Sequence, residues 1–156
     1  MSDVSPTAPL SAERRRTLEA MVQRILPGSR GAGAAETGVA VAVETALQHR
    51  VWRAGRPWIE RTLDQLQARA HAHGVGEFCA CPPEVQDDLL RTLEHDPNQV
   101  FRLVFRSLVV LSLEGLLGDP RHGGNRDFRA WQAMGLQIGH MRSGMCRDAW
   151  DTDGCA

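Results

Sequence analysis

The sequence predicts an all-α fold, a single-domain helical bundle with about five main helices and an irregular C-terminal tail. Three observations lead to this prediction. Apolar residues recur every three or four positions in successive segments, and glycine and proline separate those segments. A length of 156 residues suits one domain with a single core.

Residues 1–10 are rich in Ser, Pro and Ala and lack periodicity, so we expect a flexible N-terminal arm. Ser11 is a suitable N-cap for the first helix, because its hydroxyl can accept a hydrogen bond from a free backbone N–H. Apolar residues follow at helical spacing as far as Leu26, and Pro27 and Gly28 end the pattern.

A glycine- and alanine-rich loop precedes the second helical segment, which starts at Val39 and ends near Gly55. Valine and alanine alternate over residues 39–43, so a strand is the less favoured alternative there. Pro57 fits the first turn of a third helix, where its missing N–H is not needed. This helix is predicted to stop at Gly74.

Residues 75–81 connect the third helix to the fourth, which opens at Pro82 and Pro83 and ends before Asp96. The fifth helix, Asn98–Leu117, carries apolar residues around nearly its whole circumference. Such a helix is typical of the middle of a bundle, so we expect it to be central.

Gly118 is predicted to cap the fifth helix, and Asp119 and Pro120 to turn the chain. Gly123 and Gly124 are expected to adopt positive φ angles, which glycine reaches without steric cost.

A short helix over residues 128–134 completes the helical domain, which we place at residues 11–134. Residues 135–156 lack lasting periodicity yet contain large apolar side chains, so we expect a partner to order this irregular tail. Cys146 and Cys155 in the tail are expected to be free thiols in the cytoplasm and able to pair in an oxidising compartment.

The composition excludes several classes of function. The formal net charge is -1, so nucleic-acid binding lacks an electrostatic basis. All 18 basic residues are Arg, which excludes lysine Schiff-base chemistry and the lysine of a phosphate-binding P-loop. No apolar run is long enough to span a membrane.

Arg14, Arg15 and Arg16 look like part of a twin-arginine export signal, but polar residues interrupt the apolar stretch that should follow. We therefore expect these arginines on the solvent-exposed face of a helix. The expected location of the protein is the cytoplasm, with the periplasm as the alternative.

Common signatures of cofactor binding, nucleophilic catalysis and zinc proteases are missing from the sequence, so we expect no catalytic residues in this chain. The alternative function is a small metal-binding enzyme that uses His71, His73, Cys79 and Cys81, which are suitable zinc ligands. Their spacing differs from that of familiar zinc fingers. An exposed histidine pair and two connector cysteines are the favoured interpretation.

Other ionisable residues point to local structure. Glu114 interrupts the apolar stripe of the fifth helix, and Arg121 in the following loop is its favoured partner, because a buried carboxylate needs one. The alternative is an unpaired Glu114 that faces solvent. His49 and His95 lie near predicted helix ends, where we expect capping rather than catalysis.

The loop after the fifth helix offers polar side chains to another protein. Asp119, Arg121 and Asn125 stand on a glycine-rich turn at the end of a rigid helix, an arrangement that suits a protein contact. An ordinary helix-to-helix turn, whose Asp and Asn satisfy local backbone groups, is the alternative. The residues alone leave both interpretations open.

The run LEGLLGDPRHGGN at residues 113–125, followed by Trp131, resembles the signature of the gluconate 2-dehydrogenase small subunit family, also called subunit 3. That pattern has a Leu-Glu-Gly stretch, then Gly-Asp-Pro-Arg or Lys, an aromatic residue or His, Gly-Gly-Asn and a nearby Trp. The resemblance extends from about Ser11 to Gly139 and is most specific over Gly118–Asn125. His122 stands where the family often has Tyr.

The resemblance implies an all-helical, non-catalytic accessory subunit that binds and stabilises a large FAD-dependent dehydrogenase of the glucose-methanol-choline type. The large subunit would hold FAD and oxidise a sugar or polyol, while this chain would hold no cofactor. In some such complexes a cytochrome c subunit carries the electrons onward. Many members of the family carry a twin-arginine export signal. Contact with the large subunit is then expected at Gly118, Asp119, Pro120, Arg121, His122, Gly123, Gly124, Asn125 and Trp131.

Overall fold

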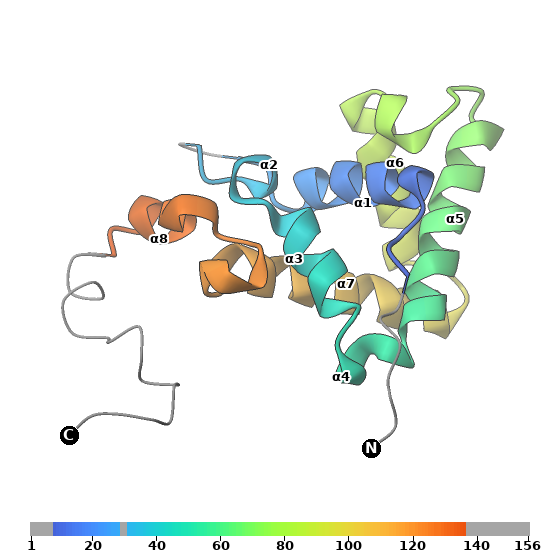
Figure 1. Cartoon of the computed structure of the whole chain (residues 1–156). Coiled ribbons are helices and arrows are strands. Elements are labelled where there is room, and N and C mark those ends of the chain that lie inside the picture. The colour runs from blue at the N-terminus through green and yellow to red at the C-terminus, as the bar shows by residue number, and fades with distance from the viewer. Residues whose placement is uncertain (1–7, 29–30, 137–156) are drawn as a thin grey trace, which may run out of the picture.

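The computed structural model of the protein describes residues 8–28 and 31–136. Every regular element in these ranges is helical, which confirms the predicted all-α fold. In Figure 1, α5 and α6 lie at one end of the molecule and α8 at the other, with α1 and α7 running between them. The helices are α1 (Ala12–Ile25), α2 (Ala34–Thr37), α3 (Val39–Ala46), α4 (Arg50–Arg53), α5 (Arg56–Ala72), α6 (Pro83–Glu94), α7 (Gln99–Leu117) and α8 (Arg129–Ala133), with the short 3-10 helices η1 (Phe78–Ala80), η2 (Pro120–His122) and η3 (Arg126–Phe128).

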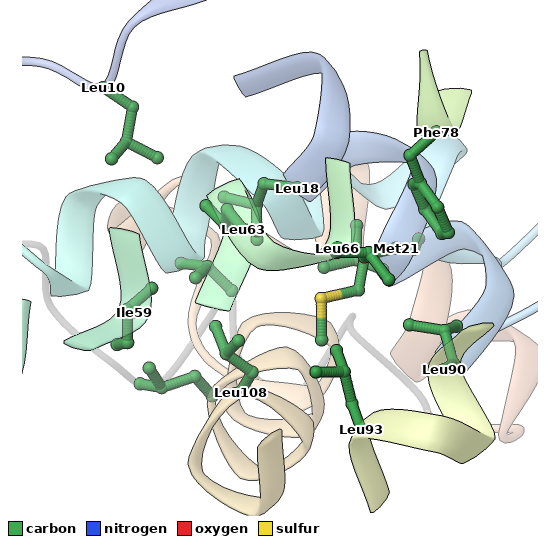
Figure 2. Close-up of a cluster of buried hydrophobic side chains, with 14 of the residues drawn as sticks. Leu10, Leu18, Met21, Ile59, Leu63, Leu66, Phe78, Leu90, Leu93 and Leu108 are labelled. Atoms are coloured by element: carbon green, nitrogen blue, oxygen red, sulfur yellow. The ribbon is translucent and has the colours of Figure 1, made fainter. Parts of the chain in front are cut away.

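A single apolar cluster holds the long helices together. Figure 2 shows side chains of α1, α5, α6 and α7 converging on it. Each helix contributes residues from one face at spacings of three or four, the pattern that predicted these helices from the sequence. Fully buried members include Leu18, Met21, Val39, Val43, Ile59, Leu63, Leu66, Phe78, Leu93 and Leu108.

Helix ends at Ser11 and Pro83 follow the predicted chemistry, and Asn98 supplies a cap that was not predicted. Ser11 Oγ accepts a hydrogen bond from the backbone N–H of Arg14 at 3.3 Å, and Asn98 Oδ1 accepts one from that of Val100 at 2.9 Å. Pro83 is the first residue of α6, where it costs no backbone hydrogen bond.

The predicted second helix, from Val39 to near Gly55, is wrong in its extent. The structure ends α3 at Ala46 and begins α4 only after His49, whose extended backbone (φ -72°, ψ 148°) breaks the helix. A further helix, α2, precedes α3, and Gly38 separates the two in a left-handed conformation with φ 76°. The alternative strand is also wrong, because residues 39–46 are helical.

The expectation that the helix now labelled α7 lies inside a bundle is only partly correct. The helix packs against α1, α3, α5 and α6 and so connects most of the fold. One of its faces nevertheless remains in solvent, although it carries large apolar side chains, as described below. No helix in the described ranges is long and apolar enough to cross a membrane.

The arginines at positions 14–16 do more than solvate a helix face. Their side chains stay partly exposed, yet each forms an ion pair that ties α1 to another part of the chain. Arg14 pairs with Glu60 and Asp64 of α5, Arg15 with Glu44 of α3, and Arg16 with Glu77 just before η1.

The ends of the chain fall partly outside the described residues. Of the expected flexible arm, residues 8–10 are held in place: Leu10 is buried and the carbonyl of Ala8 accepts a hydrogen bond from Arg56. Of the expected tail at 135–156, only Gly135 and Leu136 are described, and the predictions for Cys146 and Cys155 lie outside the described residues.

Candidate functional site

The loop Gly118–Asn125, here called the 118–125 loop, joins the C-terminal end of α7 to η3 and α8. The last carbonyl groups of a helix have no partner inside that helix, so other groups must satisfy them. Asn125 does this for Gly118: its side-chain Nδ2 donates to the carbonyl of Gly118 at 3.1 Å. Its Oδ1 accepts a hydrogen bond from the backbone N–H of Ala130 at 3.0 Å, and the residue is completely buried.

Trp131 supplies a second connection between α7 and α8. Its indole Nε1 donates to the carbonyl of Leu117 at 2.8 Å. The ring also packs against Phe128, with 5.4 Å between the ring centroids. Asn125 and Trp131, both part of the sequence signature described above, therefore fix the end of α7 to α8 through their hydrogen bonds.

Close backbone packing explains the glycines of the loop. A Cβ atom on Gly124 would lie 1.9 Å from the carbonyl oxygen of Gly115 in α7, and one on Gly115 would lie 2.9 Å from Cβ of Ala42 in α3. Gly123 has φ 94°, as predicted, and lies against Val41. The positive φ expected for Gly124 is wrong, because Gly124 is not among the described glycines that have a positive φ. Position 124 requires glycine for a different reason: its backbone lies so close to α7 that a Cβ atom has no room.

The backbone after the glycines is strained. Asn125, Asp127 and Phe128 have φ angles of 42°, 56° and 58°, in the left-handed region that side chains other than those of Asn and Asp rarely adopt. Such residues persist where the surrounding contacts determine the conformation. Here the hydrogen bonds of Asn125 and Trp131 provide those contacts.

The loop presents its charged residues outward. Arg121 and His122 are exposed and Asp119 is half-buried. Arg121 pairs with Asp119 at 3.0 Å, and Asp119 Oδ1 also accepts the Arg121 backbone N–H at 2.9 Å. These hydrogen bonds from Arg121 hold the pKa of the Asp119 carboxyl below its ordinary value. The favoured Glu114–Arg121 pair is not formed: Arg121 pairs with Asp119 instead, and Glu114 is exposed, as in the alternative.

A pocket of about 270 Å³ opens beside the loop, between α3 and the C-terminal part of α7. Small and apolar residues form most of its wall, and the ionisable side chains of His49, Glu114, Asp119 and His122 join them. It is lined by Ala42, Thr45, Ala46, His49, Leu111, Glu114, Gly115, Gly118, Asp119, His122 and Gly124.

The structure therefore divides the predicted partner-binding residues into two groups. Arg121 and His122 are exposed to contact and Asp119, Pro120 and Gly123 partly so, whereas Gly124 and Asn125 are buried and hold the loop. Gly118 and Trp131 are partly exposed, but their polar groups bond within the chain.

Sequence reasoning missed the contribution of α3 to this site. Thr45 and His49 line the pocket, although they lie more than sixty residues before the loop. No local motif marks them, since only the packing of α3 on α7 brings Thr45, and His49 in the turn after α3, to the loop. Of these residues the sequence analysis had singled out only His49, which we expected to cap a helix end.

The four residues of the alternative metal site do not assemble into one. His71 Nε2 lies 3.1 Å from Gln67 Nε2, and Cys79 Sγ lies 3.3 Å from a carboxylate oxygen of Glu77. Burial raises the pKa of the Cys79 and Cys81 thiols, which disfavours the thiolate that binds metal. In the part of the chain that the structure covers, no three His, Cys, Asp or Glu side chains could hold a metal ion.

Comparison with known proteins identifies the family. The family model described as gluconate 2-dehydrogenase subunit 3 matches residues 12–137, which include the 118–125 loop and Trp131. Neither the curated proteins nor the solved structures provide a match. Because the family model covers most of the chain, from the start of α1 past the end of α8, this protein belongs to the gluconate 2-dehydrogenase subunit 3 family.

Proposed function

We propose that this chain is the non-catalytic small subunit of an FAD-dependent sugar or alcohol dehydrogenase, and that it binds and stabilises the large flavoprotein subunit. The family description, a subunit of a dehydrogenase, implies a complex of several subunits. The glucose-methanol-choline class of the large subunit, the FAD that it holds and an associated cytochrome c subunit are parts of the same proposal.

The observation that carries the proposal is the fixed 118–125 loop beside the pocket. Asn125 and Trp131 hold the loop from inside the protein, so its exposed residues need little further ordering when another protein binds. A pre-ordered loop loses less conformational entropy on association than a mobile one. This favours a binding surface over a simple connection.

Each exposed residue has a defined task at this surface. Arg121 presents a planar guanidinium that can form two charge-assisted hydrogen bonds with a carboxylate or backbone carbonyl of the large subunit. Asp119 orients that guanidinium through its ion pair. The neighbouring pocket, whose lining includes Ala42 and Gly115, receives a side chain of the large subunit.

The test is co-expression of the tagged chain with the large subunit from the same source, followed by purification and measurement of bound FAD. Arg121→Ala is expected to keep its helical circular dichroism and to weaken the complex by roughly thirtyfold or more, as loss of one partner of an interfacial charge pair does.

The chain offers a matched control for this variant. Arg91 pairs with Asp88 on the surface of α6, and its side chain is 65% exposed against 62% for Arg121. Arg91→Ala is expected to leave the complex unchanged. If both variants assembled like the wild type, the 118–125 loop would be only a turn and the contact would lie elsewhere.

A further inference from the structure

We propose that the exposed face of α7 is a second docking surface and that it receives an amphipathic helix of the partner with a carboxylate opposite Arg106. The identification of that partner as the large flavoprotein subunit rests on the proposed function. The surface itself, here called the α7 stripe, consists of Leu103, Arg106, Val110, Leu113 and Leu117, and the exposed Glu114 lies at its edge.

The spacing of the α7 stripe indicates what can bind it. Leu103, Val110 and Leu117 are seven residues apart, and Arg106 and Leu113 fall between them at the same interval. A seven-residue repeat keeps one seam facing a neighbouring helix over its whole length. From Leu103 to Leu117 the seam extends for about 21 Å, or four turns of helix.

The apolar members of the stripe lie in solvent in the isolated chain. Leu103 is 52% exposed, Val110 49%, Leu113 42% and Leu117 45%. A continuous row of this kind on one helix differs from isolated apolar residues at a surface and marks an interaction site. The same helix buries Leu108 and Leu111 on its opposite side, so α7 can serve two apolar surfaces at once.

Arg106 determines the charge of the occupant. It lies between Leu103 and Val110, and among the described residues no carboxylate forms an ion pair with it. A helix that covers the stripe must remove Arg106 from water, which is unfavourable unless an acidic side chain pairs with it. The occupant therefore carries apolar residues at heptad spacing and one Asp or Glu.

A second copy of this chain is the competing occupant. Glu114 is exposed one turn after Val110, as Arg106 is one turn before it, so an antiparallel copy of α7 would place its Glu114 opposite Arg106. Such a pair would direct the 118–125 loops of the two copies to opposite ends of the contact, because each loop follows its own α7. A large subunit covers the loop and the stripe of one chain together, and this continuity favours it as the occupant.

The stripe also continues into the 118–125 loop. Leu117 is its last member, and the carbonyl of Leu117 accepts the hydrogen bond from the indole of Trp131. One partner can thus contact the loop and the helix without leaving a gap between the two surfaces. The α7 stripe extends the proposed interface from the end of α7 back along four turns of that helix.

The test replaces Val110 by Glu in the full chain, with Val51→Glu as the matched control, since Val51 is an exposed valine in the short helix α4. Both variants are expected to keep the circular dichroism and thermal midpoint of the wild type. Val110→Glu is expected to weaken binding of the large flavoprotein subunit at least about tenfold, and Val51→Glu to leave it unchanged.

Arg106 supplies a second, independent measurement. Arg106→Glu is expected to weaken the complex and Arg106→Lys to retain most of it, because the positive charge is kept. Equal binding by wild type, Val110→Glu and Arg106→Glu would overturn the α7 stripe and leave the proposed function standing. Failure of the wild type to bind any large flavoprotein would overturn the proposed function.

A photo-crosslinking amino acid at position 110 of the full chain identifies the occupant directly. Val110→p-benzoylphenylalanine is expected to crosslink to a helical peptide of the large subunit that contains Asp or Glu. A crosslink to a second copy of the chain, or to its own residues 137–156, would overturn the proposal, as would a peptide without an acidic residue.

Discussion

The side-chain amide of Asn125 lies between two helices and bonds to both, donating to the carbonyl of Gly118 at the end of α7 and accepting the N–H of Ala130 in α8. Both ends of the amide are thus used inside the protein. The run Gly118–Asn125, the most specific part of the family signature, therefore contains a buried residue that joins two helices as well as exposed polar residues.

Asn125→Ala is expected to destabilise the fold by about 2 to 4 kcal/mol, because it leaves buried polar groups unpaired and places Ala at φ 42°. Asn125→Gly separates the two effects, since glycine accepts this φ without strain. It should lose less stability than Asn125→Ala in urea unfolding. Equal losses would show that backbone conformation contributes nothing at this position.

Gly124→Ala should destabilise the protein by about 1 to 3 kcal/mol, because its Cβ would overlap the carbonyl of Gly115 and force α7 and the loop apart. Gly55→Ala is the control: its Cβ meets no described neighbour nearer than 3.6 Å and its φ is -83°. Thermal unfolding of both variants decides the matter, and a Gly124→Ala variant as stable as Gly55→Ala would contradict the packing of the loop on α7.

Trp131→Phe is expected to cost about 0.5 to 1.5 kcal/mol. The substitution keeps an aromatic ring against Phe128 but removes the indole N–H that reaches the carbonyl of Leu117. Hydrogen exchange should rise at the last turn of α7 and remain unchanged in α1. Unchanged exchange throughout α7 would show that the indole hydrogen bond does not hold the helix end.

Asp96 should make the stability of the fold depend on acidic pH. Burial raises its pKa, but hydrogen bonds from the Asn98 backbone and the Arg69 guanidinium outweigh burial and lower it below the ordinary value of 3.8. The charged carboxylate therefore stabilises the fold above the ordinary pKa, and this contribution disappears as the pH falls through the lowered pKa.

Asp96→Asn is accordingly expected to be about 1 to 3 kcal/mol less stable than the wild type at pH 7, and this difference should shrink below about pH 4. Urea unfolding across that range measures it. Asp88→Asn, at an exposed ion pair of α6, should change stability little at either pH. A constant difference for Asp96→Asn across the range would rule out the charged carboxylate as its cause.

The isolated chain is expected to bind no flavin and to oxidise no sugar, as the proposed function requires. The measurement is the visible absorbance of the purified chain after desalting, compared with that of the complex. A flavin band that survives desalting of the isolated chain would contradict the assignment of FAD to the large subunit.

The sequence was sufficient wherever the determining contacts are local. Helical periodicity and the cap at Ser11 depend on residues within a few positions of each other, and the structure confirms them. The break between α3 and α4 was missed because apolar spacing alone continues across it. The need for glycine at position 124 was assigned to the wrong cause, since it arises from a carbonyl nine residues earlier.

Of the candidate site, the residues of the 118–125 loop could be predicted from the sequence, but the pocket beside the loop could not. The loop residues stand together in the sequence, whereas the pocket combines α3 with α7, which no local pattern could indicate. The exposed apolar row on α7 was not predicted, because apolar residues occupy nearly every side of this helix in the sequence. A helix that is apolar on nearly all sides reads as buried, and only the position of its neighbours shows which side they leave open.

The arginines of α1 also affect how quickly the protein can fold. Arg14 bonds to a carboxylate 50 residues away, Arg16 to one 61 residues away, and Arg24 to Asp87, 63 residues away. Because α1 leaves the ribosome before α5 and α6, its ion pairs with them can close only after those later segments have been made. Since contacts distant in sequence slow folding, this domain should fold more slowly than a helical bundle of equal size whose neighbours follow one another along the chain.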